Sequence, residues 1–195
     1  MLSGFGLQLF LAGYLLVAVF IIVERMLRKT ESAKTFQRGN FDRGSTLLIG
    51  TAFGVGLVLP LLTDGLDIGP FFSIDPAEGF LALAIMILGI GLRVWAARTL
   101  GRYYTRTLLT TEEQKVITTG PYARIRHPGY LGNILLWSGF GVLSANLAVA
   151  LLFPVMFVAA YLYRISVEER MLAGTLGEDY AEYRRRTYRL VPLVY

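Results

Sequence analysis

The polar residues best suited to binding a ligand form a short run, Arg126-His127-Pro128-Gly129-Tyr130. A residue before proline is kept out of the helical region, and proline itself favours the first position of a helix. The run therefore predicts that a helix begins at Pro128, with His127 as its cap. The unpaired N–H groups of such a first turn attract an anion, for example the carboxylate of an amino-acid ligand, and Arg126 suits the same group. The alternative is that Arg126 and His127 only anchor a helix at lipid headgroups.

A second candidate group contains Arg164, Glu168 and Glu169. Arg164 and Glu168 are four residues apart and therefore share one helix face. A charged pair beside a long apolar stretch needs a partner or a polar cavity. One alternative is an ion pair at the membrane interface, although arginine before glutamate is the weaker order for helix support. The other is a metal site, for which the neighbouring sequence offers no histidine and no third acid.

A third pattern is Gly89-Ile90-Gly91 followed by Arg93. Within an apolar helix, small residues at this spacing are typical of close helix packing. The pattern lacks the preceding strand and the third glycine of a dinucleotide-binding fingerprint.

The elements that must position these residues are membrane-spanning helices. Hydrophobic residues make up 54% of the 195-residue chain and charged residues 17%, and the mean hydropathy is +0.53. A helix needs about 20 apolar residues to cross the hydrocarbon core. Residues 4–23, 45–63 and 77–97 meet this need, whereas the uncharged stretch 130–163 is too long for one span and is expected to break at Ser144-Ala145-Asn146. The sequence thus predicts an all-α integral membrane protein with five transmembrane helices, the last two forming a tight helical hairpin.

The charges test this count independently. All 19 lysines and arginines fall in residues 25–43, 93–126 and 164–189, which five spans place on one side of the membrane. The positive-inside rule makes that side cytoplasmic, with the N-terminus outside and the C-terminus in the cytoplasm. The net charge of +5 therefore indicates membrane sidedness rather than nucleic-acid binding. With no cysteine and one histidine, we expect no disulfide and no metal site.

The three patterns, in this order, resemble the isoprenylcysteine carboxyl methyltransferase family. Gly120-Pro121-Tyr122, the run from Arg126 to Tyr130, and Gly132 are similar to the family's G-x-Y-x-x-x-R-H-P-x-Y-x-G signature. The match continues through Glu168-Glu169, Gly177 to Tyr180, Tyr183, and Arg189 to Pro192, over half the chain. The Gly-x-Gly and Glu-Glu pairs also look like those of phospholipid methyltransferases. The resemblance implies one membrane domain, with two N-terminal spans in residues 1–76 and a methyltransferase core in residues 77–195.

The resemblance further implies a cytoplasmic C-terminal region that binds S-adenosylmethionine. It assigns Arg164 to the substrate. The expected catalytic residues are Arg164, Glu168 and Glu169. The implied cofactor contacts are Gln114, Lys115, Val116 and Ile117 in a strand-like segment, Tyr122, Arg126, His127, Pro128, Gly129, Tyr130 and Glu168. A carboxylate nucleophile needs no general base and would be oriented by Arg164. An amine or phenol would need a base, for which Glu168 and Glu169 are the candidates, with His127 behind them.

The expected activity is methyl transfer to a lipophilic acceptor, foremost the carboxylate of a prenylcysteine-like substrate that enters from membrane lipid. A lipid amine or a phenol is the alternative acceptor. A different alternative is a membrane reductase of the sterol or steroid type that uses NADPH, since such enzymes share the helix layout. A transporter or scaffold is disfavoured because no predicted span carries a charge at its centre.

Overall fold

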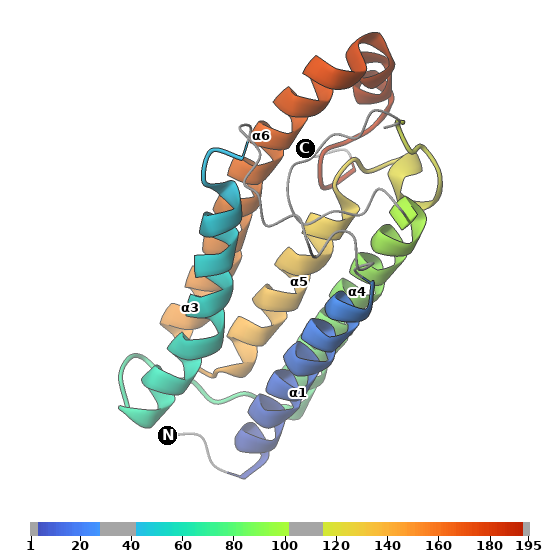
Figure 1. Cartoon of the computed structure of the whole chain (residues 1–195). Coiled ribbons are helices and arrows are strands. Elements are labelled where there is room, and N and C mark those ends of the chain that lie inside the picture. Colours follow the sequence, from blue (N-terminus) through green and yellow to red (C-terminus); the bar gives the residue numbers. More distant parts are fainter. Residues whose placement is uncertain (1–3, 28–41, 102–114, 193–195) are drawn as a thin grey trace.

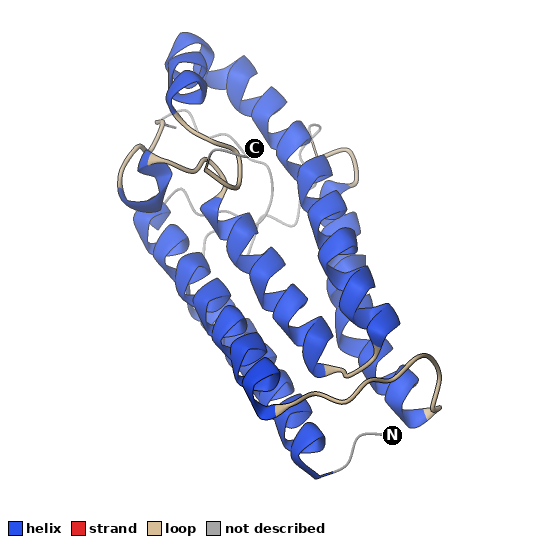
Figure 2. Cartoon of the chain, turned by 180° about the vertical axis from the view of Figure 1, so that it is seen from behind, coloured by secondary structure: helices blue, strands red, loops and turns tan. Residues whose placement is uncertain are grey.

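The computed structural model describes residues 4–27, 42–101 and 115–192. They form five long helices: α1 (Gly4–Leu27), α3 (Ser45–Gly65), α4 (Pro76–Leu100), α5 (Pro128–Leu143) and α6 (Leu147–Arg186), with a short 3-10 helix η2 (Gly120–Ala123) before α5. The helices lie side by side along one axis (Figure 1), and no strand occurs among the described residues (Figure 2). The all-helical prediction is confirmed for this part of the chain.

Four of these helices, α1, α3, α4 and α6, are long and apolar enough to cross a membrane. The remaining helix, α5, has 16 residues, which is just under the usual range for a span. The positions of the predicted spans are confirmed, while their number as transmembrane segments stays a prediction.

The last helix extends well beyond the apolar stretch. The uncharged sequence ends at Tyr163, but α6 continues through Arg164 and Glu168, as their shared helix face predicts, and across a kink at Gly177 to Arg186. At 1.5 Å per residue the part before the kink at Gly177 spans roughly 45 Å, about one and a half times the hydrocarbon thickness. The charged residues after Tyr163 end the apolar stretch but not the helix, because arginine and glutamate are good helix formers. The continuing helix therefore carries Arg164, Glu168 and Glu169 beyond the apolar part.

The predicted break at Ser144-Ala145-Asn146 joins α5 to α6 and is confirmed. Asn146 caps α6 by accepting a hydrogen bond from Val149 N (3.2 Å), and its amide donates to Ile68 O (2.9 Å) in the loop between α3 and α4. The same loop bonds to the turn through Phe72 N to Ala145 O and Leu147 N to Pro70 O, both 2.9 Å. Two connections far apart in sequence thus hold this end of the bundle together.

The closest helix contact is between α4 and α5, where Gly89 faces Gly132. Behind it, fully buried aromatic rings fill the interior, with Trp137 stacked on Phe157 of α6 at 4.9 Å. Gly89 therefore serves helix packing, as the simpler interpretation of the Gly-x-Gly pattern predicts.

Replacing Gly89 with alanine should lower the stability of the bundle. An added Cβ would lie 2.5 Å from Gly132 O and 2.8 Å from Leu136 N. These are backbone atoms that move only if the helices separate, so we expect a loss of about 1–3 kcal/mol. Gly91→Ala is the matched control, because nothing lies within 4 Å of its added Cβ. Thermal melts of the detergent-solubilised variants measure the difference, and equal melting temperatures would contradict the close contact.

The other end of the bundle gathers the described basic residues. Arg93 of α4 pairs with Glu24 of α1 (2.7 Å), and Tyr163 of α6 donates to Arg43 O ahead of α3 (2.9 Å). The ends of α1 and α4, the starts of α3 and α5 and the distal part of α6 meet here, in the upper half of Figure 1. The predicted gathering of basic residues at one end is confirmed for the described residues. That this end faces the cytoplasm remains a prediction.

Candidate active site

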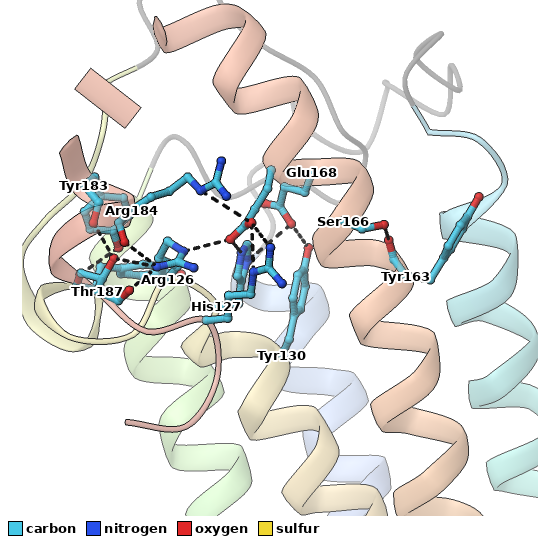
Figure 3. A network of polar contacts seen from close by, with 12 residues as sticks. Arg126, His127, Tyr130, Tyr163, Ser166, Glu168, Tyr183, Arg184 and Thr187 are labelled. Atoms are coloured by element: carbon cyan, nitrogen blue, oxygen red, sulfur yellow. Dashed lines mark hydrogen bonds and ion pairs between the residues drawn. The ribbon is translucent and has the colours of Figure 1, made fainter. Parts of the chain in front are cut away.

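The candidate site begins at the start of α5, which is at Pro128 with His127 as N-cap, as predicted. The buried imidazole lies between the two glutamates of α6: Nδ1 is 3.8 Å from Glu168 Oε2, and Nε2 is 3.4 Å from Glu169 Oε1. The ring also stacks on Tyr130, with centroids 5.5 Å apart and an interplanar angle of 3°. Figure 3 shows His127, Tyr130 and Glu168 converging where the start of α5 meets α6.

A tyrosine hydroxyl connects the predicted Arg164–Glu168 pair. Tyr130 donates to Glu168 Oε2 at 2.5 Å, and Arg164 Nε donates to the same hydroxyl at 3.4 Å. The Glu168 side chain is 23% exposed, whereas those of Glu169 and His127 are each 5% exposed. Glu168 is therefore the carboxylate of this group that can face a ligand.

Arg164 also forms an ion pair with Asp42, a residue that the sequence did not single out. Arg164 Nη1 lies 2.8 Å from Asp42 Oδ1, and it also bonds to the hydroxyls of Ser45 (2.7 Å) and Thr46 (3.0 Å) at the start of α3. Both charged side chains are buried. Burial tends to raise the pKa of Asp42, but hydrogen bonds from Ser45 and Thr46 and the charge of Arg164 outweigh it and lower that pKa.

The second glutamate, Glu169, lies at the centre of a basic cluster. Its Oε1 accepts from Arg126 Nε (2.9 Å), and its Oε2 is 3.1 Å from Arg189 and 4.0 Å from Arg184. Arg126 also donates to the backbone oxygens of Thr187 and Arg184. The structure thus brings Arg126 to Glu169. Figure 3 shows it beside Arg184 and Thr187 of the C-terminal tail, although its charge had suggested a contact with the cofactor.

The C-terminal tail folds back along the segment before α5. The helix α6 turns at Gly177, whose φ of 53° is in the range that glycine adopts readily. Beyond the turn, the Tyr183 hydroxyl donates to Tyr122 O (2.8 Å), and Tyr188 pairs with the 124–126 backbone, Tyr188 N to Arg124 O (2.9 Å) and Arg126 N to Tyr188 O (2.8 Å). The tail therefore fixes the position of the residues that lead into Pro128.

Arg93 supplies a further positive charge at the start of α5. It reaches across from α4, and a Cβ added to Gly129 would lie 2.6 Å from Arg93 Nη1. Its pairing with Glu24, which is 5% exposed, explains how an arginine is accommodated in an otherwise apolar helix. The sequence identified Arg93 but gave no sign of its partner on α1, because the two residues are 69 positions apart.

The remaining predicted cofactor contacts lie just before η2 or, in the case of Tyr122, within it. Gln114 is outside the described residues, and Lys115, Val116 and Ile117 form irregular backbone, so the strand-like interpretation is wrong for these three. Val116 lines a pocket of about 300 Å³ together with residues of η2 and of the tail, among them Tyr183 and Thr187. Tyr122 is buried in η2.

Sequence comparisons place the chain among known proteins. The family model for the isoprenylcysteine carboxyl methyltransferase (ICMT) family matches residues 82–174. Protein-S-isoprenylcysteine O-methyltransferase A of Arabidopsis thaliana is 31% identical over 156 residues, which cover 77% of this chain and 78% of that protein. The chain belongs to the isoprenylcysteine carboxyl methyltransferase family. Membership confirms the resemblance identified from the signature around Pro128 and from the Glu-Glu pair.

Other relatives match a shorter part of the chain, and they include a protein named for metal resistance. Protein-S-isoprenylcysteine O-methyltransferase B of Arabidopsis thaliana is 37% identical over 57% of this chain and 58% of its own length. The cobalt-zinc-cadmium resistance protein CzcN of Cupriavidus metallidurans is 34% identical over 57% of this chain and 50% of its own length. The chain thus spans about half the length of several curated relatives.

A solved structure shows the same fold. The eukaryotic intramembrane Ras methyltransferase ICMT superposes with a TM-score of 0.69 at 20% identity, covering 100% of this chain and 70% of that one. The likeness supports an integral membrane protein of the ICMT fold. Asp42, Ser45 and Thr46 lie outside residues 82–174, the segment that the family model matches.

Proposed function

We propose that this chain transfers a methyl group from S-adenosylmethionine to a lipophilic acceptor, foremost the carboxylate of a prenylcysteine-like molecule, at the cytoplasmic edge of the membrane. Family membership supports the reaction type, and it does not favour the reductase alternative. The observation that carries the proposal is the convergence of Tyr130, Glu168 and Arg164, which lie within hydrogen-bonding contact where α6 leaves the apolar stretch.

The residues of the site fit the charges of S-adenosylmethionine. The cofactor has a carboxylate, an ammonium group and a positively charged sulfur. The start of α5, with Arg93 against Gly129, offers a positive environment for the carboxylate. Glu168, partly exposed and held by Tyr130, suits the ammonium group or the ribose hydroxyls. Tyr130, which stacks on the buried His127 ring and is itself partly exposed, offers an aromatic group to the adenine or the sulfonium.

The two glutamates take different parts in this proposal. Glu168 is partly exposed and faces Tyr130, so we assign it to the cofactor. Glu169 is buried among Arg126, His127 and Arg189, so we assign it to holding the tail. Arg126 belongs with Glu169, since its guanidinium is bonded to that carboxylate and to Thr187.

When bound, S-adenosylmethionine supplies a methyl group activated by its positive sulfur. The protein's contribution is to hold the acceptor close to that methyl group, an effect that reaches about 7–11 kcal/mol at best. Arg164 orients the acceptor and is itself fixed by Asp42 and Tyr130. A carboxylate acceptor is already ionised near neutral pH, so the reaction requires no general base.

Glu168→Ala should abolish saturable binding of S-adenosylmethionine, because it removes the carboxylate placed for the ammonium group or the ribose. The measurement is isothermal calorimetry on the detergent-purified protein. Glu178→Ala is the matched control, because this glutamate lies on the same helix, is exposed and pairs with the exposed Arg185. If the unmodified protein bound NADPH and not S-adenosylmethionine, the proposal would be overturned in favour of a reductase.

Acceptor identity is tested separately. Purified protein with radiolabelled S-adenosylmethionine is offered N-acetyl-S-farnesylcysteine, a lipid amine and a long-chain phenol in vesicles. The proposal expects base-labile label, as in a methyl ester, on the prenylcysteine. Label on the amine or phenol alone would leave the cofactor assignment standing and exclude the carboxylate acceptor.

A further inference from the structure

The contact between α3 and the candidate site rests on one buried ion pair. Arg164 Nη1 is bonded to Asp42, Ser45 and Thr46, at 2.8, 2.7 and 3.0 Å. Asp42 is 1% exposed and Arg164 is 5% exposed. A buried pair of this kind is costly to desolvate and adds little net stability by itself. Its presence beside Tyr130 and Glu168 therefore calls for a functional account.

We infer that Asp42 is a positioning residue for methyl transfer, which fixes the guanidinium of Arg164 against the start of α3 and so directs Arg164 Nε to the Tyr130 hydroxyl. This inference rests on the proposed function, in which Arg164 orients the acceptor. It extends the site to α3, outside the segment that the family model matches.

The hydrogen bonds around Asp42 indicate that its carboxylate is held in one orientation. Asp42 accepts hydrogen bonds from the Ser45 hydroxyl (2.8 Å), the Thr46 hydroxyl (2.8 Å) and Thr46 N (3.2 Å), all in the first turn of α3. A carboxylate held by three donors is pre-oriented before Arg164 binds to it. Arginine has a long side chain that loses about 2 kcal/mol of rotamer freedom when fixed. Asp42 thus keeps that side chain in one orientation before the acceptor arrives.

The same anchoring argues against Asp42 as a stand-in for the acceptor's carboxylate. To give way to a substrate, Asp42 would have to leave its three donors in α3 while remaining buried. A stand-in would also compete with the acceptor, so its removal would improve acceptor binding. A positioning residue has the opposite effect, because its removal slows turnover.

The kinetic test compares Asp42→Asn with the unmodified full-length protein, using S-adenosylmethionine and N-acetyl-S-farnesylcysteine. We expect kcat to fall about 10- to 100-fold, as for a small misplacement of a reacting group, with S-adenosylmethionine affinity changed less than about threefold. Asp42→Glu, which keeps the charge, should recover part of kcat. An unchanged kcat, or a lower KM for the acceptor in Asp42→Asn, overturns the inference.

Asp75→Asn is the matched control for loss of a helix cap. Asp75 caps α4 by accepting from Glu78 N at 2.8 Å, but it lies at the opposite end of the bundle and is exposed. It should lose stability without losing kcat. If kcat of Asp75→Asn fell as much as that of Asp42→Asn, the effect of Asp42 would be explained by the loss of a helix cap, and the positioning role would be overturned.

A second readout does not depend on activity. Unfolding of Asp42→Asn, Arg164→Gln and the double variant forms a thermodynamic cycle, in which the double variant should lose much less than the sum of the single losses. Additive losses overturn the pairing itself. If the unmodified protein neither binds S-adenosylmethionine nor methylates the probe, the proposed function fails while this cycle still reports on the pair. Coupling with an unchanged kcat overturns the positioning role and leaves the proposed function standing.

Discussion

Replacing Arg164 with alanine should reduce turnover by about 100-fold or more while S-adenosylmethionine still binds, since losing one oriented donor to a reacting group typically costs this much. The reason is that Arg164 connects the Asp42 pair of α3 to the Tyr130 hydroxyl, whereas Glu168 is assigned to the cofactor. The measurement combines kcat with the prenylcysteine probe and calorimetric binding of the cofactor.

Alanine also leaves the Asp42 carboxylate buried without its cation, which should destabilise the protein by about 3–5 kcal/mol. Arg164→Lys is therefore the companion variant, because it keeps the charge but loses the planar fork that contacts Asp42 and Tyr130 at once. Arg170→Ala, an exposed residue on the same helix, serves as the control. Turnover in Arg164→Ala equal to that of Arg170→Ala would remove Arg164 from the mechanism.

Replacing Glu169 with alanine should detach the tail and destabilise the protein by about 3–5 kcal/mol, because Arg126 would remain buried without its main anionic partner. The tail beyond Gly177 depends on the same carboxylate through Arg189. Trypsin should then cleave faster at the exposed Arg184-Arg185-Arg186 run. Unfolding and timed proteolysis measure the two effects together.

The control for Glu169 is Glu182→Ala, which removes an exposed i,i+4 pair with Arg186. Such a pair contributes only about 0.3–0.5 kcal/mol. An intact tail and unchanged stability in Glu169→Ala would show that Tyr183 and the Tyr188 backbone bonds hold the tail without the ion pairs.

The dependence on pH follows from the same residue, which lies beyond the apolar stretch of α6. Burial tends to raise the pKa of Glu169, but hydrogen bonds from His127 and Arg126 and their charges outweigh burial and lower it from 4.5 to about 2. A carboxyl whose pKa is lower in the folded state stabilises that state above its unfolded pKa. The contribution is lost as pH falls from about 4.5 towards 2. Glu169→Gln should remove this acid-dependent part of the unfolding curve.

Much of the fold follows from the sequence because span length and charge are local properties. The uncharged stretch 130–163 is too long for one span, and its polar turn at Ser144-Ala145-Asn146 falls where α5 ends and α6 begins. Likewise, Pro128 after His127 predicts the start of α5 from backbone preferences alone. The helical spacing of Arg164 and Glu168 predicts that the helix continues past the apolar stretch, but the sequence did not predict its kink at Gly177 or its end at Arg186.

The candidate site was predicted in its parts but not in its pairings. Arg164 and Glu168 were expected to interact along one helix, whereas the structure joins them through Tyr130 and gives Arg164 an ion partner 122 residues away. Arg189 was noted only as part of the C-terminal match, with no sign of its contact with Glu169. Such long-range partners leave no periodic pattern, because the approach of α3 and of the tail is decided by tertiary packing.

The hydrogen bonds between Asn146 and the loop after α3 have a consequence for how the protein can move. Because Asn146 to Ile68, Leu147 to Pro70 and Phe72 to Ala145 join the two connections, α3 and α6 are tied at the end that lacks basic residues. If the angle between α3 and α6 changes, the helix ends at the Asn146 turn move least, and the ends near Asp42 and Arg164 move most. Thermal motion between α3 and α6 is therefore expected to pivot about this turn, and the bond between Asp42 and Arg164 limits how far the two helices separate at the end that carries the site.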